Sequence, residues 1–174
     1  GQLNYGSSAT GGTPHLGTEL LCQMTGIKMQ HIPYKGAAPM TTDLVGGQVQ
    51  LAFNNSITVL PFIRSGKLKA IGVGGETRLS VLPQIPTFAE SGLPGFNAKN
   101  WFGILAPVRT PKEIISKLSH EIARIQTMPD FRERLASQGV EPFISGPEPF
   151  AALIKADMAK YARIIKAANI KLEQ

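Results

Sequence analysis

The segment that most constrains the fold stands at the start of the chain, where a short apolar run precedes a loop of small residues and a helical pattern. Residues 3–5 are expected to form a strand, and residues 7–12 are all serine, alanine, threonine or glycine. Thr13 and Pro14 are typical of a helix start, with Thr13 as the cap, and apolar residues then recur at helical spacing as far as Gly26. This order predicts a strand, a tight loop and a helix that pack as one βα unit.

A loop of this kind in front of a helix suits a negatively charged group. The first N–H groups of a helix have no partner inside it, the helix dipole adds positive potential, and small side chains let an anion approach the backbone. No lysine follows the glycines, and their spacing does not match the dinucleotide-binding pattern, so neither a P-loop nor a dinucleotide site is expected. The alternative is a tight turn that binds nothing, because small residues also serve turns.

The next part of the chain alternates between apolar strands and helical patterns. Further strands are expected at residues 28–34, 49–53 and 68–73, and helices at residues 39–45 and 57–64. Ser56 is expected to cap the second of these helices. The alternation predicts an α/β domain with a mostly parallel sheet.

A proline-rich passage with a short helix at residues 88–91 leads to a predicted boundary, which divides the chain into residues 1–98 and residues 99–174. Extended segments are expected at residues 97–106, 140–144 and 170–172. Three amphipathic helices are expected to begin at a Thr110–Glu113 capping box, near Pro129 and near Pro147. The last part has little sheet of its own, so these helices need another surface to cover their apolar faces.

Composition narrows the classes of function. The chain has 174 residues, 43% of them hydrophobic, and a net charge of +6. Its basic residues form no dense block and do not alternate with aromatic residues, so no nucleic-acid partner is expected, and no apolar run is long enough to span a membrane. The single Cys22 excludes an intrachain disulfide and is expected to be a buried, inert thiol. No signal peptide is present, and because the first residue is Gly1 rather than Met, a processed, cut or engineered chain is expected.

The candidate ligand residues lie in three loops that follow expected strands, because ligands of open α/β sheets bind beyond the carboxyl ends of the strands. They are Ser7, Ser8, Gly11, Gly12, Thr13, His15, Tyr34, Lys35, Asn54 and Asn55. Backbone N–H groups, hydroxyls, amides and one ammonium together suit an anion better than a metal ion or a nucleobase. Each has a structural alternative: His15 as a partner of the backbone, Tyr34 as packing under the loop, Lys35 as a solvated surface residue, and the two asparagines as turn and capping residues.

Catalytic chemistry has little support in the sequence. His31 lies in an expected strand, and His120 lies on an expected helix where it faces solvent. No Ser/His/Asp set, Cys/His pair or pair of carboxylates can be assembled from spacing, so no catalytic residue, no metal ligand and no cofactor is expected.

Several segments resemble the Bug family, the periplasmic solute-binding receptors of tripartite tricarboxylate transporters. The resemblance is carried, in chain order, by NYGSSATGGTPHLGTELL, HIPYKGAAPMTTDLVGGQVQLAFNN, LPFIRSGKLKAIGV, LPQIPTFAESGLPGF and WFGILAPVRTP. It implies a two-domain protein with the type II periplasmic binding fold, in which a glycine-rich loop from each domain grips a carboxylate. It also implies that residues 1–98 form the second domain, and that residues 99–174 complete a first domain whose opening part is absent.

The resemblance further implies a small carboxylate ligand, a membrane permease as partner and a periplasmic location. Two departures concern the ligand: Gly12 stands where many members carry serine or threonine, and Asn54 stands where many carry aspartate. An aspartate would pair with a ligand ammonium, so its loss favours a carboxylate without an amino group. Exposed apolar faces of the incomplete domain offer a route to a dimer. An α/β enzyme acting on a small anion, and the effector-sensing domain of a regulator, are the alternative functions.

Overall fold

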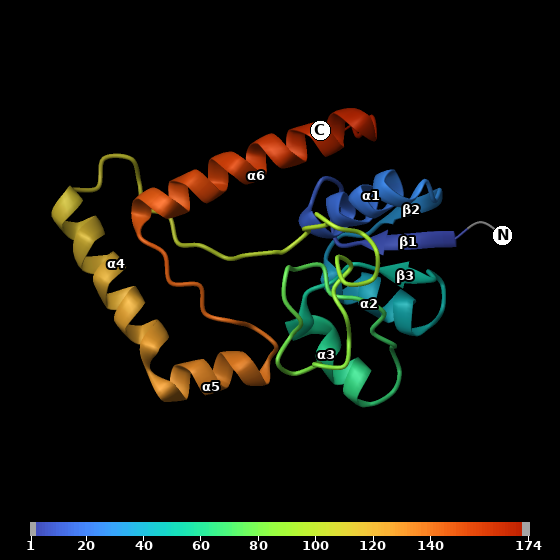
Figure 1. Ribbon diagram of the computed structural model, residues 1–174, viewed down its shortest axis with the longest axis horizontal. Coiled ribbons are helices and arrows are strands. Elements are labelled where there is room, and N and C mark those ends of the chain that lie inside the picture. The colour runs from blue at the N-terminus through green and yellow to red at the C-terminus, as the bar shows by residue number, and fades with distance from the viewer. Residues whose placement is uncertain (1–2, 172–174) are drawn as a thin grey trace.

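The computed structural model describes residues 3–171 and contains a parallel sheet of three strands (Figure 1). The strands are β1 (Leu3–Ser7), β2 (Met29–Pro33) and β3 (Leu51–Ala52), in the order β2-β1-β3. Ser7 of β1 pairs with Pro33, and Gly6 pairs with Ala52, so the carboxyl ends of all three strands lie at one edge. The predicted α/β class with a parallel sheet is confirmed.

Three helices follow the strands and cover the sheet. α1 (Thr13–Thr25) lies on one side, and α2 (Ala37–Val45) and α3 (Ser56–Arg64) lie on the other (Figure 1). For α1 and α2 this division follows from right-handed crossovers, since the chain runs from β1 to β2 in one direction and from β2 past β1 to β3 in the opposite direction. The core beside β1 contains Tyr5, Met40 and Val49, each at most 2% exposed.

The expected helix caps are wrong at three helices. The N-cap of α1 is Gly12 rather than Thr13, and that of α3 is Asn55 rather than Ser56; neither makes a side-chain capping bond. Ser56 Oγ instead donates to the carbonyl of Gly139, 2.8 Å away. The helix expected at Thr110 begins at Lys112, and no capping box forms there.

The segment between residues 65 and 98 is irregular, and the expected strand at residues 68–73 does not form. Only a single parallel bridge joins Val73 to Thr87, and the amide of Ala98 donates to Gly74 O. These groups therefore pair with neighbouring loops instead of extending the sheet. The rings of Phe53, Phe88 and Phe96 pack against one another, with centroids 4.8–5.9 Å apart.

The short helix expected at residues 88–91 is a turn. Thr87 and Glu90 bond reciprocally: the amide of Thr87 donates to Glu90 Oε2, and the amide of Glu90 donates to Thr87 Oγ1. This is the hydrogen-bond pattern of a capping box. Gly92, with φ of 99°, then ends the turn before a helix can propagate.

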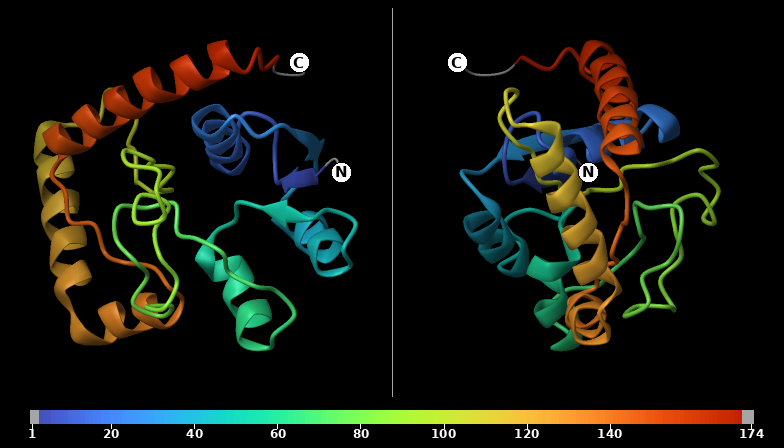
Figure 2. Two further views of the ribbon diagram at one scale, coloured as in Figure 1. Left: turned by 45° about the vertical axis from the view of Figure 1, so that its right-hand side comes forward. Right: turned by 90° about the vertical axis from the view of Figure 1, so that its left-hand side faces the viewer.

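The final third contains α4 (Lys112–Thr127), α5 (Pro129–Ser137) and α6 (Pro147–Ala167), which form an open arc beside the sheet domain (Figures 1 and 2). α6 reaches back over α1, where Gln23 Nε2 donates to Ile164 O. Neither α4 nor α5 has a buried residue. The three predicted amphipathic helices are confirmed, with the starts corrected as above.

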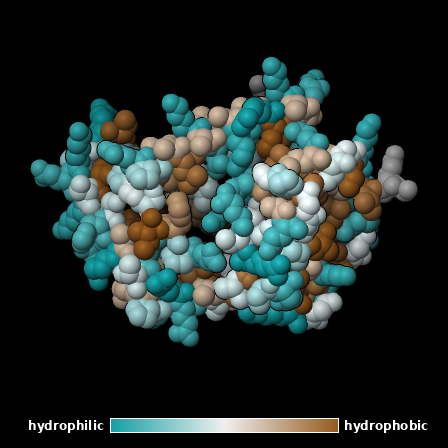
Figure 3. All heavy atoms as spheres, viewed as in Figure 1, coloured by the Kyte–Doolittle hydropathy of each residue, from teal (hydrophilic) through white to brown (hydrophobic). Residues whose placement is uncertain are grey.

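The extended segment expected at residues 97–106 is present without a strand partner among the described residues. Its large apolar side chains are open to solvent, with Phe102 75%, Ile104 73% and Leu105 76% exposed. Apolar surface also shows among polar atoms over the arc in the space-filling view (Figure 3). Trp101 in the same segment is fixed by a hydrogen bond, because its Nε1–H donates to Asp157 Oδ2 on α6, 2.7 Å away. The expected segment at residues 170–172 ends outside the described residues.

Candidate functional site

The loop after β1 and the loop after β2 are joined at the carboxyl edge of the sheet. The amide of Tyr34 donates to Ser7 O and that of Gly36 donates to Ser8 O, both at 2.9 Å. Gly36 has φ of 115°, a conformation that favours glycine and that turns the chain directly into α2. The structure thus brings together residues 7–13 and 34–36, as the strand ends predicted.

The backbone amides at the start of α1 differ from the expected set. The amide of Gly11 donates to His15 Nδ1 at 3.0 Å, and that of Gly12 donates to Ala9 O at 3.3 Å. The expectation that these two amides are open is therefore wrong, because the loop satisfies them itself. The amides of Thr13 and His15 have no acceptor within residues 3–171, since Gly12 carries no side chain to cap them.

Two expected ligand side chains turn into the protein. Ser7 is completely buried, and its Oγ lies 3.1 Å from Ala9 O and 2.7 Å from His31 Nε2. The Tyr34 hydroxyl donates to Asp43 Oδ2 on α2 at 2.8 Å. Burial, this hydrogen bond and the charge of Asp43 raise the pKa of Tyr34. Both side chains are bonded within the protein and fix the loops.

The two asparagines after β3 are also bonded within the protein. Asn54 Nδ2 donates to Thr41 Oγ1 at 3.1 Å, and its Oδ1 accepts from the amide of Asn55 at 2.8 Å. Asn55 Oδ1 accepts from Asn100 Nδ2 at 2.9 Å. Asn100 was not among the predicted site residues; it ties this loop to the segment that leaves the sheet domain.

Three of the predicted polar side chains at this edge are left open, namely Ser8, Thr13 and Lys35. Ser8 and Thr13 are half-exposed, and neither hydroxyl has a hydrogen-bond partner in the part of the chain that the structure describes. Lys35 is exposed and lies within hydrogen-bond or ion-pair distance of no group in that same part. With the amides of Thr13 and His15, they offer several donors and one positive charge, and the three loops contain no acidic residue.

Beneath the loop, His15 and His31 stack with ring centroids 3.8 Å apart. Burial lowers the pKa of His15, against the opposing charge of Glu19. Burial and the neighbouring His15 lower the pKa of His31 to about 4. Both rings are therefore neutral near pH 7. The structural alternative for the His15 side chain is confirmed, and His31 is a loop partner that spacing alone did not reveal.

The structure shows one serine–histidine contact, between Ser7 Oγ and His31 Nε2. Ser7 is 0% exposed, so it has no access to a substrate. His120 is exposed on α4, as predicted, and burial raises the pKa of the half-buried Cys22 thiol, with the charge of Glu19 adding to this effect. Among residues 3–171 no group of three histidine, cysteine, aspartate or glutamate side chains is placed to hold a metal ion.

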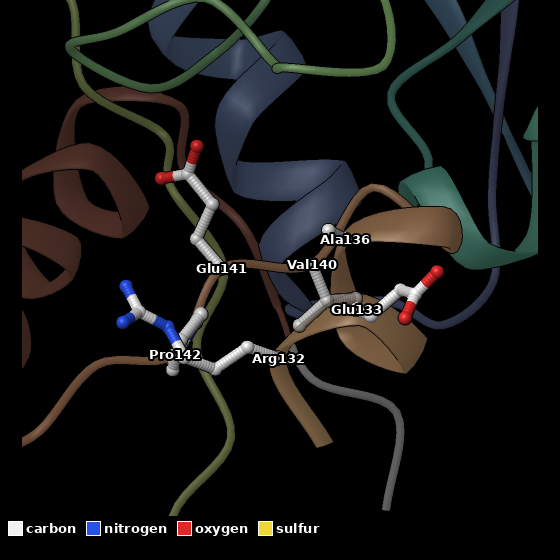
Figure 4. Close-up of a pocket in the computed structure, with 6 residues that line it drawn as sticks. All are labelled: Arg132, Glu133, Ala136, Val140, Glu141 and Pro142. Carbon is white, nitrogen blue, oxygen red and sulfur yellow. The ribbon is translucent and has the colours of Figure 1, made fainter. Parts of the chain in front are cut away.

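A hollow of about 460 Å³ lies at α5 and the segment after it (Figure 4), and Gly139 in that segment accepts a hydrogen bond from Ser56 beside the loop after β3. Its lining residues are Arg132, Glu133, Ala136, Val140, Glu141 and Pro142. The charged side chains point in different directions instead of converging on one point (Figure 4). Binding sites present convergent polar groups, so the carboxyl edge of the sheet is the better candidate. No helix in the described part of the chain is long and apolar enough to cross a bilayer.

The parallel sheet with helices on both sides defines an α/β domain, and solved structures of periplasmic binding proteins share it. The R. palustris protein Rpa4515, solved with adipate, superposes with a TM-score of 0.90 at 35% identity, over 98% of this chain and 57% of that one. The periplasmic binding protein BugD superposes with a TM-score of 0.84 at 33% identity, over 98% and 58%. The expected resemblance to periplasmic binding proteins is confirmed.

Over residues 1–170 the sequence matches the tripartite tricarboxylate transporter family receptor, and the chain belongs to this family. It is 35% identical to BugT of Bordetella pertussis, over 99% of this chain and 53% of BugT. The chain therefore spans about half the length of the curated relative.

Proposed function

We propose that this chain is the ligand-binding half of a periplasmic receptor for a small carboxylate, which it delivers to a tripartite-type membrane permease. The observation that carries the proposal is the pair of amides at the start of α1, Thr13 and His15, which have no acceptor in residues 3–171. Beside them stand the Ser8 hydroxyl and the Lys35 ammonium. A carboxylate can accept from these groups and be attracted by the helix dipole and the lysine.

The ligand class is narrowed by the charges at the edge. The three loops supply donors and a cation but no carboxylate, and Asn54 is already paired with Thr41. An ammonium on the ligand would therefore have no partner in this half of the site. This supports an organic acid without an amino group, and the adipate in the related R. palustris structure is of that kind.

The remaining expected residues would then act on the shape of the loops. Gly11 and Gly12 hold the turn, Ser7 and Tyr34 fix the loops from below, and Asn55 joins α3 to Asn100. We propose them as supports of the site, with Ser8, Thr13, Lys35 and the His15 amide as the contacts.

The domain division at residue 98 is part of the same proposal. Residues 99–174 would complete a second domain, whose other part would cover the exposed side chains of Phe102, Ile104 and Leu105. Pairing of these residues with a strand would also satisfy their backbone groups. A dimer formed through the same faces is the competing arrangement, and sedimentation of the full-length receptor distinguishes the two: a monomer supports the completed domain.

The test compares two substitutions at Thr13 that differ in the loss of its backbone N–H group. In Thr13→Pro the amide and hydroxyl are both lost, whereas Thr13→Val loses only the hydroxyl. Proline suits the first helical position, and Gly12, with ψ of 164°, already has the extended backbone that precedes proline, so the fold should tolerate the change. A charge-assisted hydrogen bond contributes about 1.5–3 kcal/mol, so the Kd for adipate should rise about 10- to 150-fold.

Titration calorimetry of the full-length receptor with adipate and other small carboxylates measures this effect. Thr13→Val should lose less affinity than Thr13→Pro, because it keeps the amide. Equal affinity of wild type and Thr13→Pro would refute the proposed contact. Turnover of a bound acid, followed by NMR, would favour the alternative of an enzyme; release of DNA by a longer form of the protein would favour that of a regulator.

A further inference from the structure

A largely buried polar cluster lies directly beneath the ligand loop. It consists of Tyr5 on β1, His31 on β2, and His15 and Glu19 on α1. His31 stacks on His15 at 3.8 Å and on Tyr5 at 5.0 Å between ring centroids. The Tyr5 hydroxyl donates to Glu19 Oε1 at 2.5 Å, and the same oxygen lies 4.0 Å from His15 Nε2.

The two imidazoles hold the loop at both of its ends. His15 Nδ1 accepts from the amide of Gly11, which places the His15 proton on Nε2, toward Glu19. His31 Nε2 bonds Ser7 Oγ, which in turn lies 3.1 Å from Ala9 O. A ring from a helix and a ring from a strand, stacked on each other, thus fix residues 7–11.

We propose that the His15–His31 stack is the positioning device of the carboxylate loop, and that protonation of the stack releases the loop and lowers ligand affinity. The inference rests on the proposed function. A proton on His15 Nδ1 removes the acceptor of the Gly11 amide, because an imidazolium has only donors. The loop then has an unpaired amide and a charge beneath it, and the Thr13 amide loses its fixed position.

The groups around the stack allow one proton but oppose two. Facing the rings are Tyr5 from β1 and Glu19 from α1, with Cys22 one helical turn further along α1. Glu19 is the acidic side chain among them, and its charge favours a proton on His15. A second proton on His31 would stand 3.8 Å from the first and is opposed by it. α6 packs on α1 through Gln23 and Ile164, and none of its charged side chains is among the groups that shift the pKa of His15 or His31.

The experiment uses substitutions that keep both hydrogen bonds but cannot take up a proton. In His15→Asn the Oδ1 atom can replace Nδ1 as acceptor for Gly11, and in His31→Gln the side-chain N–H can replace Nε2–H toward Ser7. His120→Gln on α4 is the matched control, because His120 is exposed and outside the cluster. Adipate is the probe, and titration calorimetry is done on the full-length receptor at about pH 7.5 and about pH 4, because burial lowers the pKa of both rings below the ordinary histidine value.

For wild type and His120→Gln, the Kd should rise between the two pH values about tenfold more than for the His15→Asn/His31→Gln double variant, since one hydrogen bond to the loop is at stake. Protonation of adipate itself cancels in this comparison. His15→Leu, which has no acceptor, should bind weakly at both pH values. Equal pH dependence of wild type and the double variant would overturn the inference.

Hydrogen exchange of the Gly11 amide, measured without ligand, separates this failure from failure of the proposed function. Its protection should fall at about pH 4 in wild type and persist in the double variant, if the amide is released by a histidine proton. If small carboxylates do not bind wild type at about pH 7.5 while exchange behaves as stated, the proposed function fails and the positioning role stands. Unchanged protection in wild type would refute the positioning role itself.

Discussion

The bond between Tyr5 and Glu19 should make a measurable contribution to stability. Tyr5 is 0% exposed, and its hydroxyl donates to Glu19 Oε1 at 2.5 Å. Tyr5→Phe keeps the ring, its packing and its stack on His31, and removes only the donor. The buried carboxylate oxygen then loses a hydrogen bond that nothing else in residues 3–171 replaces.

Hydrogen bonds to charged groups contribute about 1.5–3 kcal/mol to stability. The Glu19 side chain is 20% exposed, so water can solvate part of the carboxylate once the hydroxyl is gone. The free energy of unfolding should therefore fall by about 1.5–2 kcal/mol, the lower half of that range. Burial, and next the bond to Glu19, raise the pKa of Tyr5, so the hydroxyl remains a donor at every pH used.

Urea unfolding of the full-length protein near pH 7, followed by circular dichroism, measures the change. Tyr161→Phe on α6 is the control: its ring lies under Lys160, and its hydroxyl has no partner among the described residues. That variant should remain within about 0.5 kcal/mol of wild type. A loss in Tyr5→Phe no larger than in Tyr161→Phe would refute the reasoning, because it would mean that the buried bond is no better than a bond to water.

Two further changes test the packing and the histidine stack. In Gly6→Ala a new Cβ would stand 2.9 Å from Met40 Cγ, so the free energy of unfolding should fall by about 1–3 kcal/mol in the same urea titration. Gly75→Ala is the control and should be close to neutral, because no atom lies nearer than 3.9 Å to its new Cβ. The pKa of His31 is lowered to about 4, so the unfolded chain binds a proton that the native chain does not, and stability should fall as pH falls from about 6.5 to about 4. His31 is half-buried and partly screened, so the loss should be about 1–2 kcal/mol; His31→Gln should reduce it, and an equally steep fall in that variant would contradict the assignment.

The sequence predicted the first βα unit and the meeting of the loops after β1 and β2 well, because their signals are local. A loop of small residues, Pro14 at the helix start and Gly26 at its end define α1 without help from distant residues. The parallel sheet follows from the alternation of elements, and the carboxyl edge follows from the sheet. The loops after β1 and β2 are accordingly found side by side.

The strand expected at residues 68–73 failed because a strand needs a partner, which an apolar run does not guarantee. Val73 finds its partner in Thr87, and Gly72 is covered by the ring of Phe88, whose nearest atom would lie 3.0 Å from a Cβ there. The capping patterns also did not predict the helix starts. Thr110 lies one residue outside the N-cap of α4, whereas Thr87 and Glu90 make the reciprocal bonds of a capping box where none was predicted. Tertiary packing decides such shifts of one residue.

The availability of each amide could not be read from spacing. In the sequence, Gly11, Gly12 and Thr13 are equivalent small residues before a helix. In the structure, the amide of Gly11 donates to the His15 ring and the amide of Gly12 donates to Ala9 O, so neither is open. The ring orientation depends on His31, which comes from another strand. The set of open donors is therefore a property of the packed cluster and not of the loop alone.

The start of α1 shows how stability and binding compete at this edge. A serine, threonine or aspartate at the N-cap typically adds about 1 kcal/mol over alanine and about a few tenths of a kcal/mol over glycine, by accepting from an amide in the first turn. Gly12 makes no such bond, so the amides of His15 and Thr13 both have no acceptor within residues 3–171. A loop left this loosely tied to its own helix would lose its shape, unless other groups held it. The stacked histidines do so from below, through Gly11 and Ser7. The amides therefore stay in place without a capping side chain, which would compete with a carboxylate for the same hydrogen atoms.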